Sequence, residues 1–162
     1  MSICNHLPLI TELPDYSGNW NEYLEAIYNI FKNDFIDNTV LWNSKPVRIF
    51  WEKQFQGKER SFWHIISKGK DDLNREPDLR RCERVSWVRE LLMECTEECE
   101  NLLIWTKYHV KSKRNRVYIW CREVNYIVVI EERKINYHLI TAFVVSDYSV
   151  NGYFKEYQKF KY

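Results

Sequence analysis

Three arginines stand within five positions in the segment EPDLRRCERVSW: Arg80, Arg81 and Arg84. A guanidinium donates paired hydrogen bonds to phosphate oxygens and stays charged at every physiological pH. Such a cluster suits a site that binds phosphate, or one that stabilises a phosphorane while negative charge develops on it. Because Asp78 and Glu83 stand beside the arginines, a second interpretation is open, in which they form ion pairs on a solvent-exposed helix face.

His64 is the histidine whose surroundings most favour chemistry, because it lies in the apolar run SFWHIIS, just before a polar loop. Imidazole exchanges a proton near neutral pH, so His64 could serve as a general acid or base. The alternative is a structural histidine that is hydrogen-bonded at a half-buried edge. His109 shares a predicted strand face with Lys107, where a solvated strand end is the simpler explanation.

The segment from Lys107 to Arg122 combines basic side chains with interleaved aromatic rings. Positive groups beside exposed rings bind single-stranded nucleic acid through phosphate contacts and base stacking. A twisted hairpin that packs its rings on a core explains the same pattern. The candidates for gripping a substrate in this segment are Lys107, Arg116 and Tyr118.

The chain has 162 residues, of which 45% are hydrophobic, enough for the core of one domain. Its 24 basic and 23 acidic residues leave a net charge of +1, so any site for a polyanion must be local. Five cysteines without a C-x-x-C pair indicate neither a disulfide framework nor a zinc site, and we expect no metal and no cofactor. With no leader sequence and no membrane-length apolar run, we expect a cytoplasmic protein without membrane contact.

Hydrophobic periodicity predicts two helices in the first part of the chain. An irregular arm over residues 1–18 precedes a helix over 19–35, and a hairpin follows at 40–51. The run 61–67 is too short to classify. A second helix is expected over 77–95, with apolar residues on one face and the arginines on its flanks or opposite side.

From residue 102 onward the hydrophobic period changes to two, in four segments: 102–110, 116–124, 126–133 and 137–145. Short connectors join antiparallel neighbours, so these segments predict a four-stranded meander. A short amphipathic helix is expected after Gly152. We therefore expect residues 19–162 to form a single α+β domain, with helices packed on one face of the sheet.

The segments GKERSFWHIIS, REPDLRRCERVSW and YIVVIEERKINYHLITAF, in this order, resemble an uncharacterised, prophage-associated family of small bacterial proteins. The later half of that family looks like the barnase, EndoU, colicin and RelE superfamily of metal-independent ribonucleases, many of them toxins. The resemblance implies a RelE-like or barnase-like fold, and PDLRRCER is its most specific part. It points to these shared site positions: His64, Asp78, Arg80, Arg81, Glu83, Arg84 and Thr141.

Residues and resemblance together predict a metal-independent endoribonuclease that cleaves RNA by attack of the 2′-hydroxyl on the adjacent phosphate. It would be a toxin of a toxin–antitoxin or phage-related system, with RNA as substrate and an antitoxin protein as a candidate partner. Two alternatives stay open. One is a non-catalytic interaction module or inhibitor in a phage–host system that uses an aromatic surface, and the other is an RNA-binding protein without cleavage.

Each candidate residue has an expected role in the ribonuclease hypothesis. His64 is the general acid or base, Glu83 orients it or accepts a proton, and Thr141 hydrogen-bonds the phosphate. The residues expected to stabilise the phosphorane are Arg80, Arg81 and Arg84. Ser67 and Asp78 join the substrate-binding set of Lys107, Arg116 and Tyr118. The hypothesis requires His64 and Thr141 to meet at the arginine face of the second helix.

Overall fold

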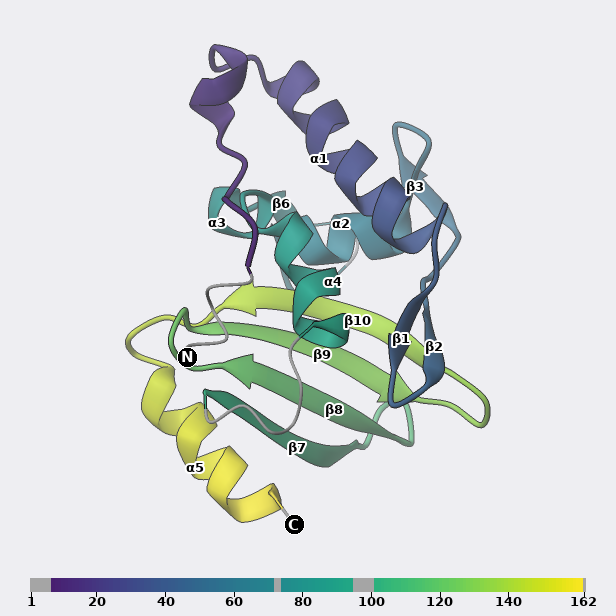
Figure 1. Ribbon diagram of the computed structural model, residues 1–162, viewed down its shortest axis with the longest axis vertical. Coiled ribbons are helices and arrows are strands. Elements are labelled where there is room, and N and C mark those ends of the chain that lie inside the picture. Colours follow the sequence, from purple (N-terminus) through teal and green to yellow (C-terminus); the bar gives the residue numbers. More distant parts are fainter. Residues whose placement is uncertain (1–6, 72–73, 95–100, 162) are drawn as a thin grey trace.

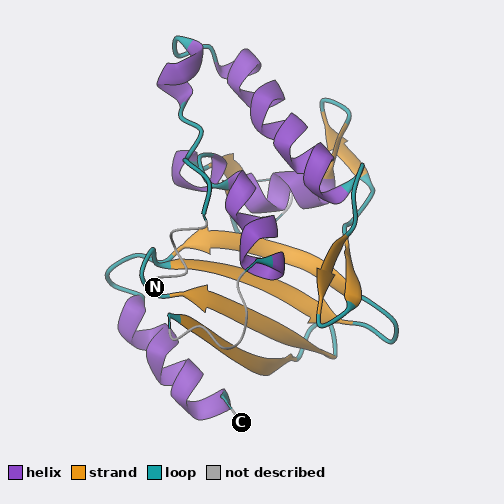
Figure 2. Cartoon of the chain, viewed as in Figure 1, coloured by secondary structure: helices purple, strands orange, loops and turns teal. Residues whose placement is uncertain are grey.

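A six-stranded sheet lies at the centre of the protein, whose structure is a computed structural model describing residues 7–71, 74–94 and 101–161. The strand order is β1-β2-β10-β9-β8-β7. Most helices cover one face of the sheet, and the C-terminal helix lies against the other (Figures 1 and 2). The predicted α+β class is therefore confirmed.

The second half of the chain supplies four strands that are consecutive antiparallel neighbours. They are β7 (Leu102–His109), β8 (Arg114–Cys121), β9 (Tyr126–Glu132) and β10 (Tyr137–Val144).

The hairpin of β1 (Val40–Trp42) and β2 (Lys45–Arg48) extends this sheet on the β10 side. Because β2 runs parallel to β10, the sheet is mixed, and the expectation of a four-stranded antiparallel sheet was wrong in size and strand direction. The hairpin covers an edge of β10 that would otherwise present unpaired backbone groups. Pairing between segments so far apart in sequence leaves no local pattern to detect.

The first half of the chain builds the helical layer. The helices are α1 (Trp20–Phe35), α2 (Arg60–Ile66), α3 (Leu79–Cys82) and α4 (Val85–Met93). Two small ladders flank α2: β3 (Lys53–Phe55) with β4 (Lys58–Glu59), and β5 (Ser67–Lys68) with β6 (Glu76–Pro77).

Helix α1 confirms the periodicity argument, since its buried side chains form one stripe that includes Leu24, Ile27 and Phe31. The Asn19 side chain accepts a hydrogen bond from the backbone N–H of Glu22 at 3.2 Å and so caps the helix.

The second predicted helix is divided in two, because Arg84 has non-helical backbone angles (φ −112°, ψ 19°) and stands between α3 and α4. Its inward residues Cys82, Val88 and Leu92 are buried as expected, but Leu79 is 46% exposed. The predicted end at Cys95 lies outside the described residues.

Helix α5 (Val150–Phe160) covers the second face of the sheet, so the expectation of helices on a single face was wrong. It packs on a second hydrophobic cluster that includes Trp105, Trp120 and Ile127. The aromatic side of the hairpin β7–β8 is thus a core surface rather than an exposed one. Gly152 lies inside α5 and not before it.

The described part of the predicted arm is held against the helical layer. It contains a 3₁₀ helix, η2 (Leu13–Tyr16). Trp87 donates its indole N–H to the carbonyl of Pro8 at 2.8 Å, and the Tyr23 hydroxyl donates to the carbonyl of Thr11 at 2.8 Å. No helix in the described ranges is long and apolar enough to cross a membrane.

Trp120→Ala tests the packing of α5 on the sheet. Trp120 is fully buried, so we expect a loss of about 3–5 kcal/mol in the free energy of unfolding, measured by urea denaturation. Tyr148→Ala is the matched control, because Tyr148 is 99% exposed and its loss should change stability by less than about 0.5 kcal/mol. Similar stabilities for the two variants would contradict this packing.

Candidate functional site

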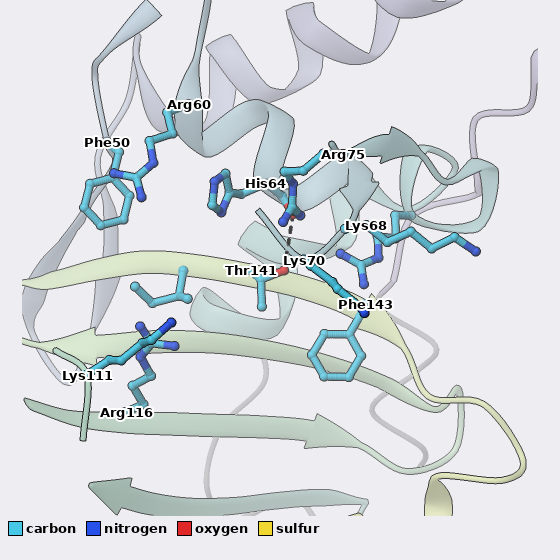
Figure 3. A pocket seen from close by; sticks show the side chains of 13 residues that line it. Phe50, Arg60, His64, Lys68, Lys70, Arg75, Lys111, Arg116, Thr141 and Phe143 are labelled. Carbon is cyan, nitrogen blue, oxygen red and sulfur yellow. Dashed lines mark hydrogen bonds between the residues drawn. The ribbon is translucent and has the colours of Figure 1, made fainter. Parts of the chain in front are cut away.

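A cleft of about 480 Å³ lies between α2, strand β10 and the loop after β5 (Figure 3). Seven of the lining side chains are Arg or Lys, and no described residue of the lining is Asp or Glu. The cleft is therefore a local concentration of positive charge in a chain whose net charge is only +1. Its lining residues are Phe50, Arg60, His64, Lys68, Gly69, Lys70, Arg75, Arg81, Lys111, Arg116, Ile140, Thr141 and Phe143. We call it the cationic cleft.

His64 and Thr141 meet in this cleft although they are far apart in sequence. The Thr141 hydroxyl donates a hydrogen bond to the backbone carbonyl of His64 at 3.2 Å, the contact drawn as a dashed line in Figure 3. Strand β10 shifts register between Leu139 and Thr141, a β-bulge that leaves Ile140 without a partner residue on β9. Bulges of this kind re-aim side chains, and here Ile140 and Thr141 both line the cleft.

Arg81 reaches the cleft from α3. Its guanidinium donates to the carbonyl of Ser67 at 2.6 Å and lies over the ring of Phe143, 5.7 Å from the centroid. Burial lowers the pKa of Arg81, yet an arginine stays charged at neutral pH. No described carboxylate forms an ion pair with Arg81, and the bond to Ser67 uses one of its five N–H donors. The remaining donors can bind an anion.

Arg75 is held by the same short stretch of backbone. It donates to the Ser67 hydroxyl at 3.0 Å and to the carbonyls of Ser67 at 2.5 Å and His64 at 3.2 Å. Gly69 permits this approach, because a Cβ there would stand 2.7 Å from the carbonyl oxygen of Asn74 and 2.8 Å from the Cα of Arg75. Ser67 is buried and does not line the cationic cleft, so its role is to hold Arg75 and Arg81 rather than to contact a substrate.

Arg116 approaches from β8 and is anchored by Glu131. Its Nε donates to the Glu131 carboxylate at 2.9 Å, and Arg133 donates to the other oxygen at 2.8 Å. Glu131 is 1% exposed. Burial alone would raise its pKa, but hydrogen bonds from Arg116 and Ser112 and the charges of Arg116 and Arg133 hold the pKa below its usual range. The charge of Arg116 is thus shared with a carboxylate, whereas no described carboxylate pairs with Arg81.

The other predicted residues near α3 lie outside the lining of the cleft. Asp78 caps α3 by accepting from the backbone N–H groups of Arg80 at 2.9 Å and Arg81 at 3.3 Å. Arg80 is exposed. Glu83 forms an ion pair with Arg84 at 3.0 Å, and Arg84 lies over the ring of Trp87. Of the three clustered arginines, the structure brings only Arg81 to His64 and Thr141.

Two predicted substrate-binding residues are engaged by other parts of the fold. Lys107 forms an ion pair with Glu156 of α5 at 2.5 Å. Tyr118 stacks on Trp105 with ring centroids 5.0 Å apart, in the cluster beneath α5. Neither residue lines the cationic cleft.

Sequence reasoning missed several cleft residues, among them Arg60, Lys68 and Lys70. Arg60 stands four positions before His64, a spacing that would have placed both on one helix face had the run 61–67 been recognised as helical. Lys68 and Lys70 belong to a segment that was interpreted only as a polar loop.

Comparison of the chain with models of protein families, with curated proteins and with solved structures finds no match. Within the described residues, no group of three or more His, Cys, Asp or Glu side chains is arranged to hold a metal ion.

Asp78→Ala should unfold the first turn of α3 and misplace Arg81, because two backbone N–H groups lose their acceptor. We expect a loss of about 0.5–2 kcal/mol in the free energy of unfolding, measured by urea denaturation. Asp78→Asn keeps a capping oxygen and should retain most of the stability. A loss as large for Asn as for Ala would point to the ion pair with Lys68 instead.

Glu131 should make stability depend on pH. Since its folded pKa lies below the ordinary value of 4.5, the carboxylate stabilises the fold above the unfolded pKa, and this contribution is lost as pH falls through the folded pKa. Glu131→Gln should therefore lower the free energy of unfolding by about 3 kcal/mol at neutral pH and show a shallower loss below about pH 4.5. Glu132→Gln, a partly exposed neighbour, should keep the parent's acid profile, and a parent-like profile for Glu131→Gln would contradict the argument.

Proposed function

We propose that the protein is a metal-independent endoribonuclease that cleaves RNA by attack of a 2′-hydroxyl on the adjacent phosphate. The observation that supports this most directly is the meeting of His64, Arg81 and Thr141, from three separate elements, in one strongly positive cleft. The resemblance to ribonuclease toxins adds the expectation that the protein belongs to a toxin–antitoxin or phage-related system.

The positive charges suit the transition state of this reaction. Attack of the 2′-oxygen on phosphorus forms a phosphorane whose oxygens carry more negative charge than the starting phosphodiester. Arg81 is fixed by a neutral carbonyl, so its charge is oriented before the substrate arrives, and no described carboxylate cancels it in an ion pair. Preorganised donors of this kind stabilise a transition state more than water can.

His64 is the residue that we assign to proton transfer. It would take the proton from the attacking 2′-hydroxyl, while the bond between phosphorus and the 5′-oxygen breaks and that oxygen receives a proton. The products are a 2′,3′-cyclic phosphate and a 5′-hydroxyl. Because Glu83 is paired with Arg84, the proton for the 5′-oxygen is assigned to a lysine of the cleft or to water.

The role of Thr141 differs from the one expected from the sequence. A hydroxyl has one proton, and Thr141 donates it to the carbonyl of His64. A phosphate oxygen would also need a donor, and the only proton of the Thr141 hydroxyl is already used. Thr141 is therefore assigned as a positioning residue that holds α2 against β10.

RNA binding without cleavage is a second candidate, favoured by one observation. The described lining offers a single imidazole and no carboxylate, whereas cleavage of RNA requires one proton to be taken from the 2′-hydroxyl and another to be given to the 5′-oxygen.

Incubating RNA with the protein in excess chelator tests the proposal. We expect fragments that end in 2′,3′-cyclic phosphate, with the rate lowered by about 10²–10⁴-fold in His64→Ala and about 10²–10³-fold in Arg81→Ala. Arg80→Ala distinguishes the two arginines. The cleavage rate should fall in this variant if all three clustered arginines contribute, and should change little if only the residues that line the cleft contribute. Thr141→Val should lower the rate, and Thr141→Ser should restore it.

Lys32→Ala is the control for a lost surface charge, because Lys32 lies at an exposed position of α1 and, among the described residues, pairs only with Asp37. Retarded but intact RNA would favour binding without cleavage. Neither retardation nor cleavage by the parent chain would overturn the proposal and favour a non-catalytic interaction module.

A further inference from the structure

A second basic pocket, of about 400 Å³, lies at the turn between β9 and β10 and beside the start of β8. It is lined by Arg114, Arg133, Lys134, Ile135, Asn136 and His138, and no described residue of this lining is acidic. We call it the turn pocket.

Three polar atoms of the turn pocket are buried and have no hydrogen-bond partner among the described residues. They are Nε of Arg133, Oδ1 of Asn136 and Nδ1 of His138. Buried polar atoms in folded proteins are almost always hydrogen-bonded, and exceptions commonly mark a place for a ligand or ordered water. Their gathering in one pocket, beside two exposed cations, points to a ligand with negative charge.

The turn pocket adjoins the cationic cleft. Glu131 accepts from Arg116 on the cleft side and from Arg133 on the turn side, so one carboxylate separates the two. His138 packs edge-on against Phe50 of the cleft, with centroids 5.1 Å apart.

Strand register places both pockets on one face of the sheet. Arg116, Glu131 and His138 stand opposite one another on β8, β9 and β10. Arg114 precedes Arg116 by two positions, on the same face and about 7 Å along the strand.

We propose that the turn pocket binds a neighbouring nucleotide of the same RNA strand whose scissile phosphate occupies the cationic cleft. The identity of this polyanion rests on the proposed function. Arg114 and Lys134 provide charge for a phosphate, and Arg133, whose charge is shared with Glu131, adds the N–H donor of its Nε. Oδ1 of Asn136 is an acceptor and needs a donor, which a bare phosphate lacks and a ribose 2′-hydroxyl supplies. We assign that donor to a ribose 2′-hydroxyl, and on this assignment the pocket favours RNA over DNA of the same length.

Oligonucleotide length is the variable that tests this inference. Binding is measured in a His64→Ala background, which keeps the RNA intact, by fluorescence anisotropy with a dinucleotide and a longer oligonucleotide. We expect the longer RNA to bind more tightly. Arg114→Ala or Lys134→Ala should weaken the longer RNA about tenfold, reduce its salt slope by about 1 and leave the dinucleotide unchanged.

Asn136→Ala should reduce the preference for the longer RNA over DNA of the same length, and Lys32→Ala is the control for general loss of charge. Equal affinity for the two lengths of RNA would overturn the proposal for the turn pocket. So would Arg114→Ala and Lys134→Ala variants that bind the longer RNA as Lys32→Ala does. Neither result would affect the proposed cleavage activity, which is measured separately on the parent chain. Failure of the His64→Ala protein to bind either RNA, together with no cleavage by the parent chain, would overturn both proposals.

His138 provides a second readout. Burial lowers its pKa, Arg133, Arg114 and Arg48 lower it further, and Glu131 opposes them. A phosphate bound beside the imidazole would favour its charged form, so the pKa should rise when the longer RNA binds, as followed by NMR. A pKa unchanged by saturating longer RNA would place the phosphate elsewhere and overturn the proposal.

Discussion

The carbonyl groups at the C-terminal end of α2, including that of its capping residue Ser67, are the point on which the site depends. The end of a helix leaves carbonyls without partners inside the helix, and in this protein they are satisfied by other elements. Arg75 and Thr141 donate to the carbonyl of His64, and Arg75 and Arg81 donate to that of Ser67. Cations are also favoured near a helix C-terminus by its dipole. The need to cap one short helix thus gathers the side chains that make the cleft positive.

Charge in the protein is arranged by separation rather than by excess. Acidic and basic residues almost balance in number over the whole chain. The described carboxylates nevertheless form ion pairs with only some of the basic side chains, so the charge of the cleft is not neutralised by them. Glu83 and Glu156 engage Arg84 and Lys107 away from the cleft. Glu131 forms an ion pair with Arg116 at the edge of the cleft. Arg81 has no ion pair among the described residues.

Local patterns predicted the elements well and their assembly less well. Periodicity identified α1 and all four strands from β7 to β10, because each is long enough to show its period. It missed the break at Arg84 and the pairing of β2 with β10, which depend on tertiary contacts. In the arginine cluster, a step of one residue rotates a side chain by about 100° around a helix, and so Arg80 faces solvent while Arg81 faces the cleft. Composition alone cannot make that distinction.

The bulge in β10 has a consequence for how one strand serves two neighbouring sites. In a regular strand, residues separated by an odd number of positions face opposite sides. His138 and Thr141 are such a pair, but the extra residue Ile140 brings them opposite Glu131 and Val129, which share one side of β9. Deletion of that single residue would restore strict alternation and still leave His138 and Thr141 on one side, so what the insertion adds is the side chain of Ile140 itself in the lining of the cationic cleft.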